Sequence, residues 1–466
     1  MHASPALFWF RQDLRLADNP GLFGLRTRPL LAAFVLDDEA AGAWAYGGAQ
    51  RWWLHHSLKA LGEALEARGI GLHLASGDSA EIIPRLAAAI GAEEVVAARM
   101  YEPWAVRRDG AVARALAKDG RSLTLETGAL LHDPDGLRTG AGKPYSVYTP
   151  FARALSAQPE APPPLPAPQA LHPAAEAPQG LALDDLGLLP RRDWWREFPQ
   201  HWMPGEAGAQ RALADAGKVL PAYGSARDFP ARAGTSRLSP HLHFGEVSPR
   251  QVFHAARGEG AFLKELYWRE FSYHLLAHRP EMPEQPLRPE FARMPWRRDA
   301  RALRAWQQGR TGYPFIDAGM RQLWRTGWMH NRVRMATASF LVKHLLLPWQ
   351  EGEAWFWDTL LDADLANNSA NWQWVAGSGV DASPFFRIFN PITQGEKFDA
   401  DGAYVREWVP ELAKLPAKFL HCPWLAPAEL LSKAGIELGR DYPRAIVAHE
   451  EARARALAGY AGIRAS

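Results

Sequence analysis

Cysteine, long apolar runs and excess charge of either sign are all scarce in this sequence of 466 residues. Its single cysteine, Cys422, excludes an intrachain disulfide and any zinc or iron–sulfur site built from cysteines, and it favours a reducing compartment. The most apolar stretch, 336–347, contains Lys343 and His344 and is far shorter than the roughly 18 residues of a membrane-spanning helix. The N-terminus has no basic region before its short apolar run, so we expect neither a signal peptide nor export. These absences favour a cytoplasmic protein without a membrane anchor.

Positive and negative charges nearly balance, with 53 Lys and Arg against 51 Asp and Glu. The formal charge of +2 does not indicate a nucleic-acid or membrane partner, and either partner needs a local basic patch. Hydrophobic residues make up 47% and charged residues 22%, a balance typical of folded globular proteins. Tryptophan is abundant: five of the 20 lie in residues 1–150 and 15 in residues 151–466. The second part of the chain therefore uses indoles for a special purpose or for an aromatic core.

Short apolar runs alternate with helical patterns over residues 1–128. Buried strands are predicted at Ala6–Phe10, Leu30–Leu36, Gly71–Ala75, Val95–Ala98 and Ser122–Leu125, and the helices between them include Gln50–Arg68 and Ser79–Ile90. This alternation predicts an α/β domain built on a doubly wound parallel sheet. No G-x-G-x-x-G pattern follows the first strand, so a standard dinucleotide site at its end is not supported.

A proline-rich segment separates this domain from the rest of the chain. Nine prolines fall between Gln158 and Pro190, a composition that suits neither a sheet interior nor a long helix, so residues 129–200 are predicted as a surface linker. Residues 201–466 show no strand pattern. They carry amphipathic patterns that predict an all-α second domain, with helices at Ala261–His278, Ile316–Thr326, Met329–Leu347 and Glu353–Leu361.

Two segments of the second domain place polar groups where a ligand can use them. Residues 234–239 put three hydroxyl groups and a run of amides at a helix start, which suits a phosphate, although Ser and Thr are also ordinary helix N-caps. Glu265, Trp268, Arg269 and Ser272 share one helix face, where a carboxylate, an indole and a guanidinium converge. The alternative is an ion pair along the helix beside a core indole.

Two further clusters lie near the middle of the second domain. Asn331, Arg334 and Met335 share a face that continues into apolar positions, and a buried polar ligand or a solvated turn explains them equally well. Residues 362–374 hold two acids, three Asn and two Trp, which are too polar for a core helix and too aromatic for a solvated one. The two carboxylates have no histidine or further acid at ligand spacing, so we expect no metal and favour a polar, ring-shaped ligand.

Together these segments resemble the photolyase/cryptochrome family and, within it, the class I cyclobutane pyrimidine dimer photolyases. The resemblance covers nearly the whole chain. Its motifs are, in order, Trp9–Arg15, Gly234–Ser239, Glu265–Phe271, Thr326–Met335, Asn371–Trp374 and Phe386–Pro391. It implies an N-terminal α/β domain, a long linker and an all-α C-terminal domain that binds FAD.

The resemblance also implies which residues hold the flavin. Those matching the family's phosphate-binding positions are Tyr223, Thr235, Ser236, Arg237, Leu238 and Ser239. Those matching positions around the flavin rings are Arg269, Trp328, Arg334, Asp362, Asp364 and Asn368. Asn368 matches the residue that faces flavin N5, and Arg334 with Asp362 matches an ion pair beside the rings. An arginine and an amide near the rings favour negative charge on the reduced flavin, provided that the acids are themselves paired.

The implied activity is light-dependent DNA repair by a carbon–carbon lyase, deoxyribodipyrimidine photo-lyase. Photoexcited, reduced, anionic FAD passes an electron to a pyrimidine dimer that has been flipped out of the duplex, and the cyclobutane ring splits. The residues matching the lesion pocket and DNA contacts are Arg227, Glu265, Trp268, Asn331, Arg332, Met335, Trp374 and Arg387. Glu265, Asn331, Met335 and Asn368 carry the implied catalytic roles. The two indoles sandwich the dimer, and the three arginines bind backbone phosphates.

Further cofactor expectations concern electron supply and light harvesting. Trp372, Trp349 and Trp296 match a chain of three indoles through which electrons reach the flavin, although core aromatics are the simpler interpretation without the resemblance. Folate-type members carry an Asn-Glu pair shortly after a Tyr-Glu, whereas here Tyr101–Glu102 is followed by Pro103–Ala105. We therefore expect a deazaflavin antenna in the N-terminal domain, or no antenna, rather than folate.

Two alternative functions differ from dimer repair in particular residues. In the family, members that repair (6-4) photoproducts have two histidines at the positions matching Asn331 and Met335. This chain has neither histidine, so dimer repair is the expected reaction. A cryptochrome, a blue-light photoreceptor that binds FAD without repair, is the rival function. A long C-terminal tail favours a cryptochrome, and we expect none here. We expect a monomeric enzyme of bacterial type, nucleoid-associated when it is bound to UV-damaged DNA.

Overall fold

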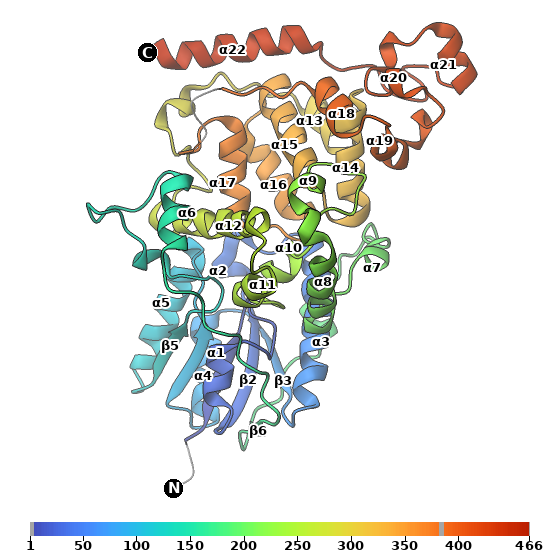
Figure 1. Ribbon diagram of the computed structural model, residues 1–466. Helices are drawn as coiled ribbons and strands as arrows, with labels where there is room; N and C mark the ends of the chain where they lie inside the picture. Colours follow the sequence, from blue (N-terminus) through green and yellow to red (C-terminus); the bar gives the residue numbers. More distant parts are fainter. Residues whose placement is uncertain (1–3, 382–385, 466) are drawn as a thin grey trace.

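The computed structural model describes residues 4–381 and 386–465. An α/β domain and a helical domain lie end to end, with helix α22 (His449–Ala465) at the outer end of the helical domain (Figure 1). The two predicted domain types are therefore confirmed.

The sheet of the first domain is parallel throughout. Its strands are β1 (Ala6–Phe10), β2 (Pro29–Leu36), β3 (Leu72–Ser76), β4 (Glu94–Ala98), β5 (Ser122–Glu126) and β6 (His172–Pro173). The order β3-β2-β1-β4-β5 grows outward in both directions from β1, which is the predicted doubly wound arrangement. Strands β1 to β5 lie within one residue of their predicted bounds.

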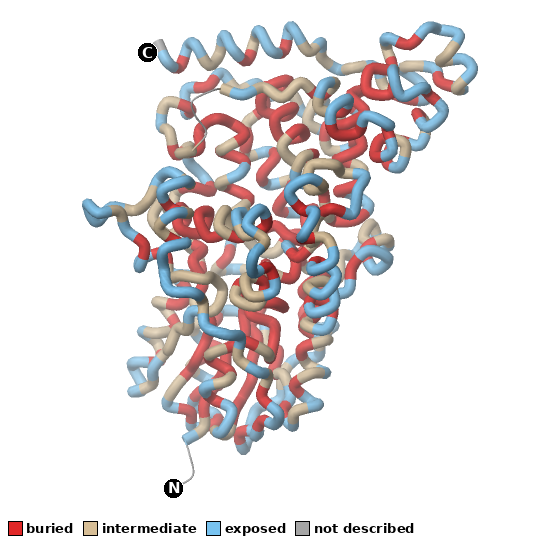
Figure 2. Tube along the Cα trace, in the orientation of Figure 1, coloured by how far each residue is buried: buried red, intermediate tan, exposed pale blue. Residues whose placement is uncertain are grey.

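Alternate residues of β1 supply the two cores on either side of the sheet. Phe8 and Phe10 pack with the α3 indoles Trp52 and Trp53 on one face, and Trp9 packs with α4 and α5 residues on the other. This alternation explains why the sheet is buried on both faces (Figure 2). The helices of this domain are α1 (Pro20–Leu25), α2 (Asp38–Ala41), α3 (Gly48–Glu66), α4 (Ser79–Ala89) and α5 (Pro103–Ala117).

The proline-rich linker runs over the surface and hydrogen-bonds the α/β domain at several places. Its strand β6 pairs with the first residues of β2, so it adds a short strand that the sequence analysis did not predict. The Leu165 amide donates to the Asp18 carboxylate at 2.9 Å, and the Leu165 carbonyl accepts from the Asp18 amide at 2.9 Å. Helix α6 (Tyr148–Ser156), near the start of the linker, packs against α12 of the helical domain.

The second domain is helical, as predicted: beyond residue 200 the described residues contain one isolated bridge, between Leu438 and Tyr442, and no strand. Its helices are α7 (Phe198–His201), α8 (Glu206–Val219), α9 (Tyr223–Ala226), α10 (Ser239–His243), α11 (Pro249–Ala255), α12 (Gly260–His278), α13 (Ala300–Gln307), α14 (Pro314–Thr326), α15 (Asn331–Ser339), α16 (Trp349–Thr359), α17 (Leu365–Ala376), α18 (Pro391–Phe398), α19 (Ala403–Trp408), α20 (Ala417–Leu420), α21 (Ala428–Ala434) and α22.

One helix prediction, a single α-helix over Met329–Leu347, is wrong. Helix α15 is N-capped by the His330 ring and becomes a π-helical turn over Phe340–His344. Leu346 then has a φ of 55°, a left-handed conformation that ends the helix. The π turn buries Lys343, whose Nζ lies 3.5 Å from the centroid of the Phe386 ring. The apolar periodicity continues through this turn, so it does not reveal the change of helix type.

Helix α3 joins the two domains. Its Gln50 amide donates to the carbonyls of Trp357 and Ala363 at 3.1 and 3.2 Å, and its Trp53 indole donates to the buried Glu246 at 2.9 Å. Gly47, just before α3, lies so close that a Cβ there would be 2.4 Å from the Trp357 carbonyl oxygen. Residues 4–381 and 386–465 contain no helix with both the length and the hydropathy of a bilayer span.

Candidate functional site

The helical domain brings together an arginine, an aspartate and a serine from three segments. The Arg334 guanidinium of α15 donates to the Asp362 carboxylate at 2.8 Å, and the Ser239 hydroxyl at the start of α10 donates to the same oxygen at 2.6 Å. Arg334 is held in place by a second bond, from its Nε to the Met329 carbonyl at 2.7 Å. The ion pair that the resemblance implies is therefore present.

Several buried polar atoms around this pair have no hydrogen-bond partner among the described residues. They are Oδ1 of Asp362, both ring nitrogens of His243 and Nε of Arg237. Buried polar groups normally find partners, and each one left unpaired costs free energy. The cluster therefore fits a polar ligand with donor and acceptor atoms, such as the ring system and phosphates of FAD.

Asp364 is buried and plays a different part from Asp362. Its Oδ1 accepts from the Asn367 amide at 2.8 Å and caps helix α17, while its other oxygen accepts from the Tyr273 hydroxyl. Burial opposes the ionisation of Asp364, but the nearby His243 imidazole, whose Nδ1 lies 4.0 Å from Oδ2, and the charge of Arg269 outweigh burial and lower the pKa of Asp364 to about 2. Asp364 thus stays charged and paired, the condition under which acids tolerate a negative ligand nearby.

The loop at 234–239 has backbone features that suit close contact with a ligand. A Cβ at Gly234 would lie 2.7 Å from the Ala226 carbonyl oxygen, so only glycine fits there. Arg237 has a φ of 53°, and its guanidinium carbon lies 4.2 Å from the centroid of the Trp202 ring and 5.2 Å from that of Trp328. Thr235 and Ser236 lie between Gly234 and Arg237, and the amide of Leu238, which follows Arg237, donates to the Ser236 hydroxyl at 3.4 Å. Tyr223, also expected at the phosphates, is buried against Phe262.

Asn368 belongs to a buried chain of hydrogen bonds between α17 and α16. Its side-chain amide donates to the Glu353 carbonyl at 3.0 Å, and the Ser369 hydroxyl donates to the Glu353 carboxylate at 2.5 Å. Burial raises the pKa of Glu353 well above its usual value. Neither Glu353 nor Tyr273 is among the site residues predicted from the sequence, although Tyr273 lies four residues after Arg269 on the same face of α12.

Most of the expected lesion residues form ion pairs or aromatic contacts with their neighbours. Glu265 forms an ion pair with Arg227, and Arg332 donates to Asp228 at 2.6 Å. Trp268 stacks on Tyr148, while the Arg387 guanidinium lies 5.9 Å from the centroid of the Trp374 ring. Asn331 is exposed and Met335 half-buried. Two of the three expected phosphate ligands thus already have carboxylate partners, which the sequence analysis did not foresee.

The three expected electron-transfer indoles lie in or beside one core cluster. Trp349 and Trp372 are buried members of it, and Trp296 packs against its edge half-buried. Trp372 contacts α16 so tightly that a Cβ at Gly352 would lie 2.1 Å from its ring. A fully buried indole that the sequence analysis did not single out, Trp306, packs edge-on against Trp372 with ring centroids 6.3 Å apart.

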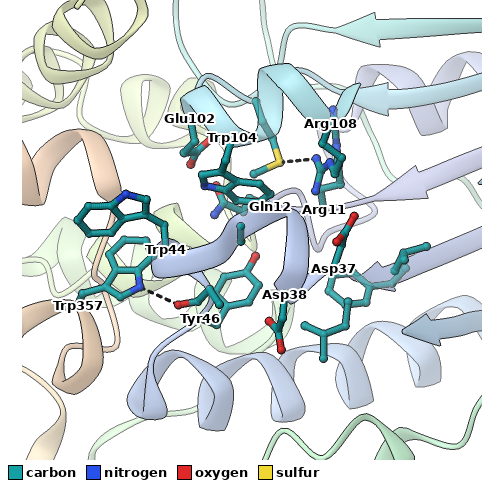
Figure 3. A pocket seen from close by; sticks show the side chains of 16 residues that line it. Arg11, Gln12, Asp37, Asp38, Trp44, Tyr46, Glu102, Trp104, Arg108 and Trp357 are labelled. Carbon is teal, nitrogen blue, oxygen red and sulfur yellow. Dashed lines mark hydrogen bonds between the residues drawn. The ribbon is translucent and has the colours of Figure 1, made fainter. Parts of the chain in front are cut away.

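A cleft lies at the carboxyl ends of β1, β2 and β4, where strand order reverses (Figure 3). The indoles of Trp44 and Trp357 lie at one end and Arg11 with Arg108 at the other. The Arg11 Nη1 pairs with the Asp109 carboxylate at 2.5 Å, but its Nε and Nη2 are buried without partners among the described residues. Trp357 comes from α16, so the cleft lies between the two domains.

Comparison with known proteins identifies the chain's relatives. Residues 262–462 match a model described as the FAD binding domain of DNA photolyase, and residues 6–169 match a DNA photolyase model. Deoxyribodipyrimidine photo-lyase of Agrobacterium fabrum is 50% identical over 477 residues, which cover 100% of this chain and 99% of that protein. The chain belongs to the photolyase/cryptochrome family. Cryptochrome-1 of Arabidopsis thaliana is a second family relative, 38% identical over 97% of this chain and 69% of its own length.

The crystal structure of a bacterial class III photolyase from Agrobacterium tumefaciens has a TM-score of 0.96 and 49% identity, covering 100% of this chain and 99% of that one. The class I assignment expected from the motifs is therefore not supported. The expected enzyme type, deoxyribodipyrimidine photo-lyase, is confirmed by the names of the photolyase-family relatives, and the helical domain is confirmed as an FAD-binding domain.

Proposed function

We propose that this photolyase-family chain is a class III enzyme that uses light and reduced FAD to split cyclobutane pyrimidine dimers in DNA. The observation that carries the proposal is the part-buried Arg334–Asp362 pair, whose remaining carboxylate oxygen is buried and has no hydrogen-bond partner among the described residues. The full-length similarity to a bacterial class III photolyase supports the class.

The proposed flavin site supplies positive charge and hydrogen bonds without free acids. When bound, reduced FAD supplies an electron donor that light excites. Arg334 places its charge where a reduced ring system carries negative charge, and the buried Asn368 adds an amide dipole. The charge of Asp362 is offset by the Arg334 guanidinium, and the charge of Asp364, which accepts a hydrogen bond from Tyr273, is offset in part by the nearby Arg269. Tyr223, residues 235–239, Arg269 and Trp328 complete the proposed site.

In the proposed lesion pocket, Trp268 and Trp374 stack on the flipped pyrimidines and Glu265 binds a polar base edge. Asn331 and Met335 lie on α15 beside Arg334 and contact the rest of the dimer. Arg227, Arg332 and Arg387 bind the backbone phosphates, which positions the DNA without reading its sequence.

The deciding experiment is illumination of the reduced holoenzyme with an oligonucleotide that contains one thymine dimer. Light-dependent loss of the dimer supports repair, and a dark sample is the control. A protein that binds flavin and responds to blue light but leaves the dimer intact contradicts repair and favours the cryptochrome function, which the Arabidopsis relative represents.

Glu265→Ala tests the lesion pocket. We expect it to weaken binding of the dimer-containing oligonucleotide about tenfold, since a charge-assisted hydrogen bond is lost, and to leave the bound flavin unchanged. Glu281→Ala is the matched control, because Glu281 pairs with Arg279 just beyond the end of α12. Equal affinities of both variants, measured by fluorescence anisotropy, contradict the assigned role of Glu265.

For electron supply we propose the path Trp372, Trp349 and Trp296. Trp296→Phe is expected to slow light-driven flavin reduction and to spare repair by chemically reduced enzyme. Absorption spectra during illumination measure the rate of flavin reduction. A wild-type rate in Trp296→Phe would show that Trp296 does not belong to the path.

We also propose that the cleft between the domains binds a second chromophore. Its aromatic end suits a planar ring system, and the unpaired nitrogens of Arg11 suit an anionic tail. Deazaflavin remains the predicted occupant. Absorption spectra and mass spectrometry of the released cofactors distinguish deazaflavin, folate and no second chromophore, and Arg11→Gln is expected to lower the content of the second chromophore alone.

The domain bounds 1–128, 129–200 and 201–466, the monomeric state and the cytoplasmic, DNA-associated location remain proposals. Size-exclusion chromatography with light scattering tests the monomer.

A further inference from the structure

Tyr148, at the start of the linker helix α6, stacks face to face on Trp268. The ring centroids are 3.6 Å apart and the planes differ by 3°, so one face of the indole is covered. Trp268 lies on α12, one turn after Glu265, and is half-buried. A base can therefore stack only on the other face of this indole or against its edge.

Tyr148 makes further contacts that hold it in place. Its hydroxyl donates to the Lys264 carbonyl at 2.9 Å, directly before Glu265 in the chain. Its ring also meets Phe271 edge-on, with centroids 5.9 Å apart. One residue of the linker thus contacts α12 at Trp268, at Phe271 and at Lys264, the residue directly before Glu265.

Stacking of this kind restricts the indole to one orientation before any ligand arrives. An exposed tryptophan samples several rotamers, and a ligand that needs one of them must overcome the lost side-chain entropy. A stacked aromatic partner removes that cost in advance. The Trp268 side chain is therefore prearranged by a residue outside the helical domain.

We propose that Tyr148 is a positioning residue for lesion recognition, which fixes Trp268 with one face open to a base of the dimer. This inference rests on the proposed repair function. It gives the linker a part in recognition, because without α6 the indole has no partner on its covered face.

The test compares Tyr148→Leu with Tyr148→Phe in flavin-loaded enzyme. Leu removes the stack and keeps apolar volume, whereas Phe keeps the stack and loses the bond to the Lys264 carbonyl. We expect Tyr148→Leu to weaken binding of a dimer-containing single strand about three- to tenfold, leaving binding of the undamaged strand unchanged, since aromatic pairs contribute this much beyond area. Tyr148→Phe should stay within about twofold of wild type.

Two controls separate positioning from loss of structure. Tyr145→Leu removes an aromatic ring that packs on Phe151 and His274 near α6, and it should leave dimer affinity unchanged. In a Trp268→Leu background, Tyr148→Leu should have no further effect on affinity. Flavin absorption and the single-turnover repair rate at saturating DNA should be the same in all Tyr148 variants.

Each other outcome decides against the inference. Wild-type affinity in Tyr148→Leu overturns it, as does tighter binding, which indicates that Tyr148 occupies the face that the base needs. A wild-type enzyme with no preference for the damaged strand overturns the proposed repair function first and this inference with it. If the wild-type enzyme prefers the damaged strand and Tyr148→Leu does not weaken that binding, the role of Tyr148 is overturned and the proposed repair function stands.

Discussion

Glu270 shows how one buried residue makes stability depend on pH. It lies on α12 beside Arg269; its Oε2 accepts from the Leu131 amide at 2.9 Å, and its Oε1 has no hydrogen-bond partner among the described residues. Burial raises the pKa of Glu270 to about 7, although Arg269 and the Leu131 amide oppose the rise. Between the ordinary glutamate pKa and about 7, Glu270 is therefore protonated in the folded protein and ionised in the unfolded chain.

Because the pKa of Glu270 is higher in the folded state than in the unfolded chain, the stability of the protein depends on pH. Between the ordinary glutamate pKa and about 7 the native state binds more protons, so the contribution of Glu270 to stability falls as pH rises through that window. Glu270→Gln keeps an acceptor for the Leu131 amide and removes the titration. We expect the variant to be more stable than wild type by about 1–3 kcal/mol at pH 8 and similar at pH 5. Urea unfolding of both proteins at pH 5 and pH 8 measures the difference in their free energies of unfolding. The same difference at both pH values contradicts the prediction.

At the scale of elements, helices α16 and α17 depend on the absence of a side chain at Gly352. A Cβ there would lie 2.1 Å from the Trp372 ring and 2.6 Å from Leu341, and a ring in a packed core has little room to move. Gly352→Ala is expected to destabilise the protein by about 1–3 kcal/mol and to slow photoreduction by displacing Trp372. Thermal unfolding and flavin photoreduction measure the two effects.

Gly62 provides the control for that substitution. It lies within helix α3, and a Cβ there would meet nothing within 4 Å. Gly62→Ala is expected to stabilise by about 0.4–1 kcal/mol, because alanine loses less backbone entropy in a helix. If Gly62→Ala and Gly352→Ala destabilise the protein equally, the steric clash with Trp372 is not the cause of the destabilisation in Gly352→Ala.

Element prediction succeeds where apolar periodicity and burial agree. Strands such as β1 are uninterrupted apolar runs buried on both faces, and their bounds could be predicted almost to the residue. The π turn after α15 and the strand β6 could not, because the first keeps the same apolar pattern and the second has only two residues, one of them proline.

Site residues that share one helix could be predicted from the sequence, whereas contacts between distant segments could not. Spacing along one helix places Glu265 and Trp268 on one face. It cannot show that Arg227 reaches Glu265 or that Tyr148 covers Trp268, because these contacts join segments 38 and 120 residues apart in sequence. The family resemblance supplied roles for Asp362 and Asp364 together, whereas the structure separates a paired acid with one free oxygen from a helix cap.

At the scale of the whole molecule, DNA binding must come from local charge, since the formal charge is only +2. Arg227 and Arg332 each have a carboxylate partner, while Arg387 is exposed beside Trp374. An arginine whose charge is already offset releases fewer counterions when it meets a phosphate than one that is not. The three arginines should therefore contribute unequally to the salt dependence of binding.

We expect log Kd for a dimer-containing duplex to rise with log salt with a slope between about 1 and 3, since each neutralised phosphate contributes roughly 0.9. Arg387→Ala should lower this slope by about one, and Arg227→Ala by less, because its charge is already balanced by Glu265. Arg26→Ala, on the surface of the α/β domain, should leave the slope unchanged. Anisotropy titrations at four or more salt concentrations measure the slopes. An equal decrease for Arg387→Ala and Arg227→Ala would show that the Arg227–Glu265 pair opens on DNA, which frees Glu265 to bind the lesion at the same moment.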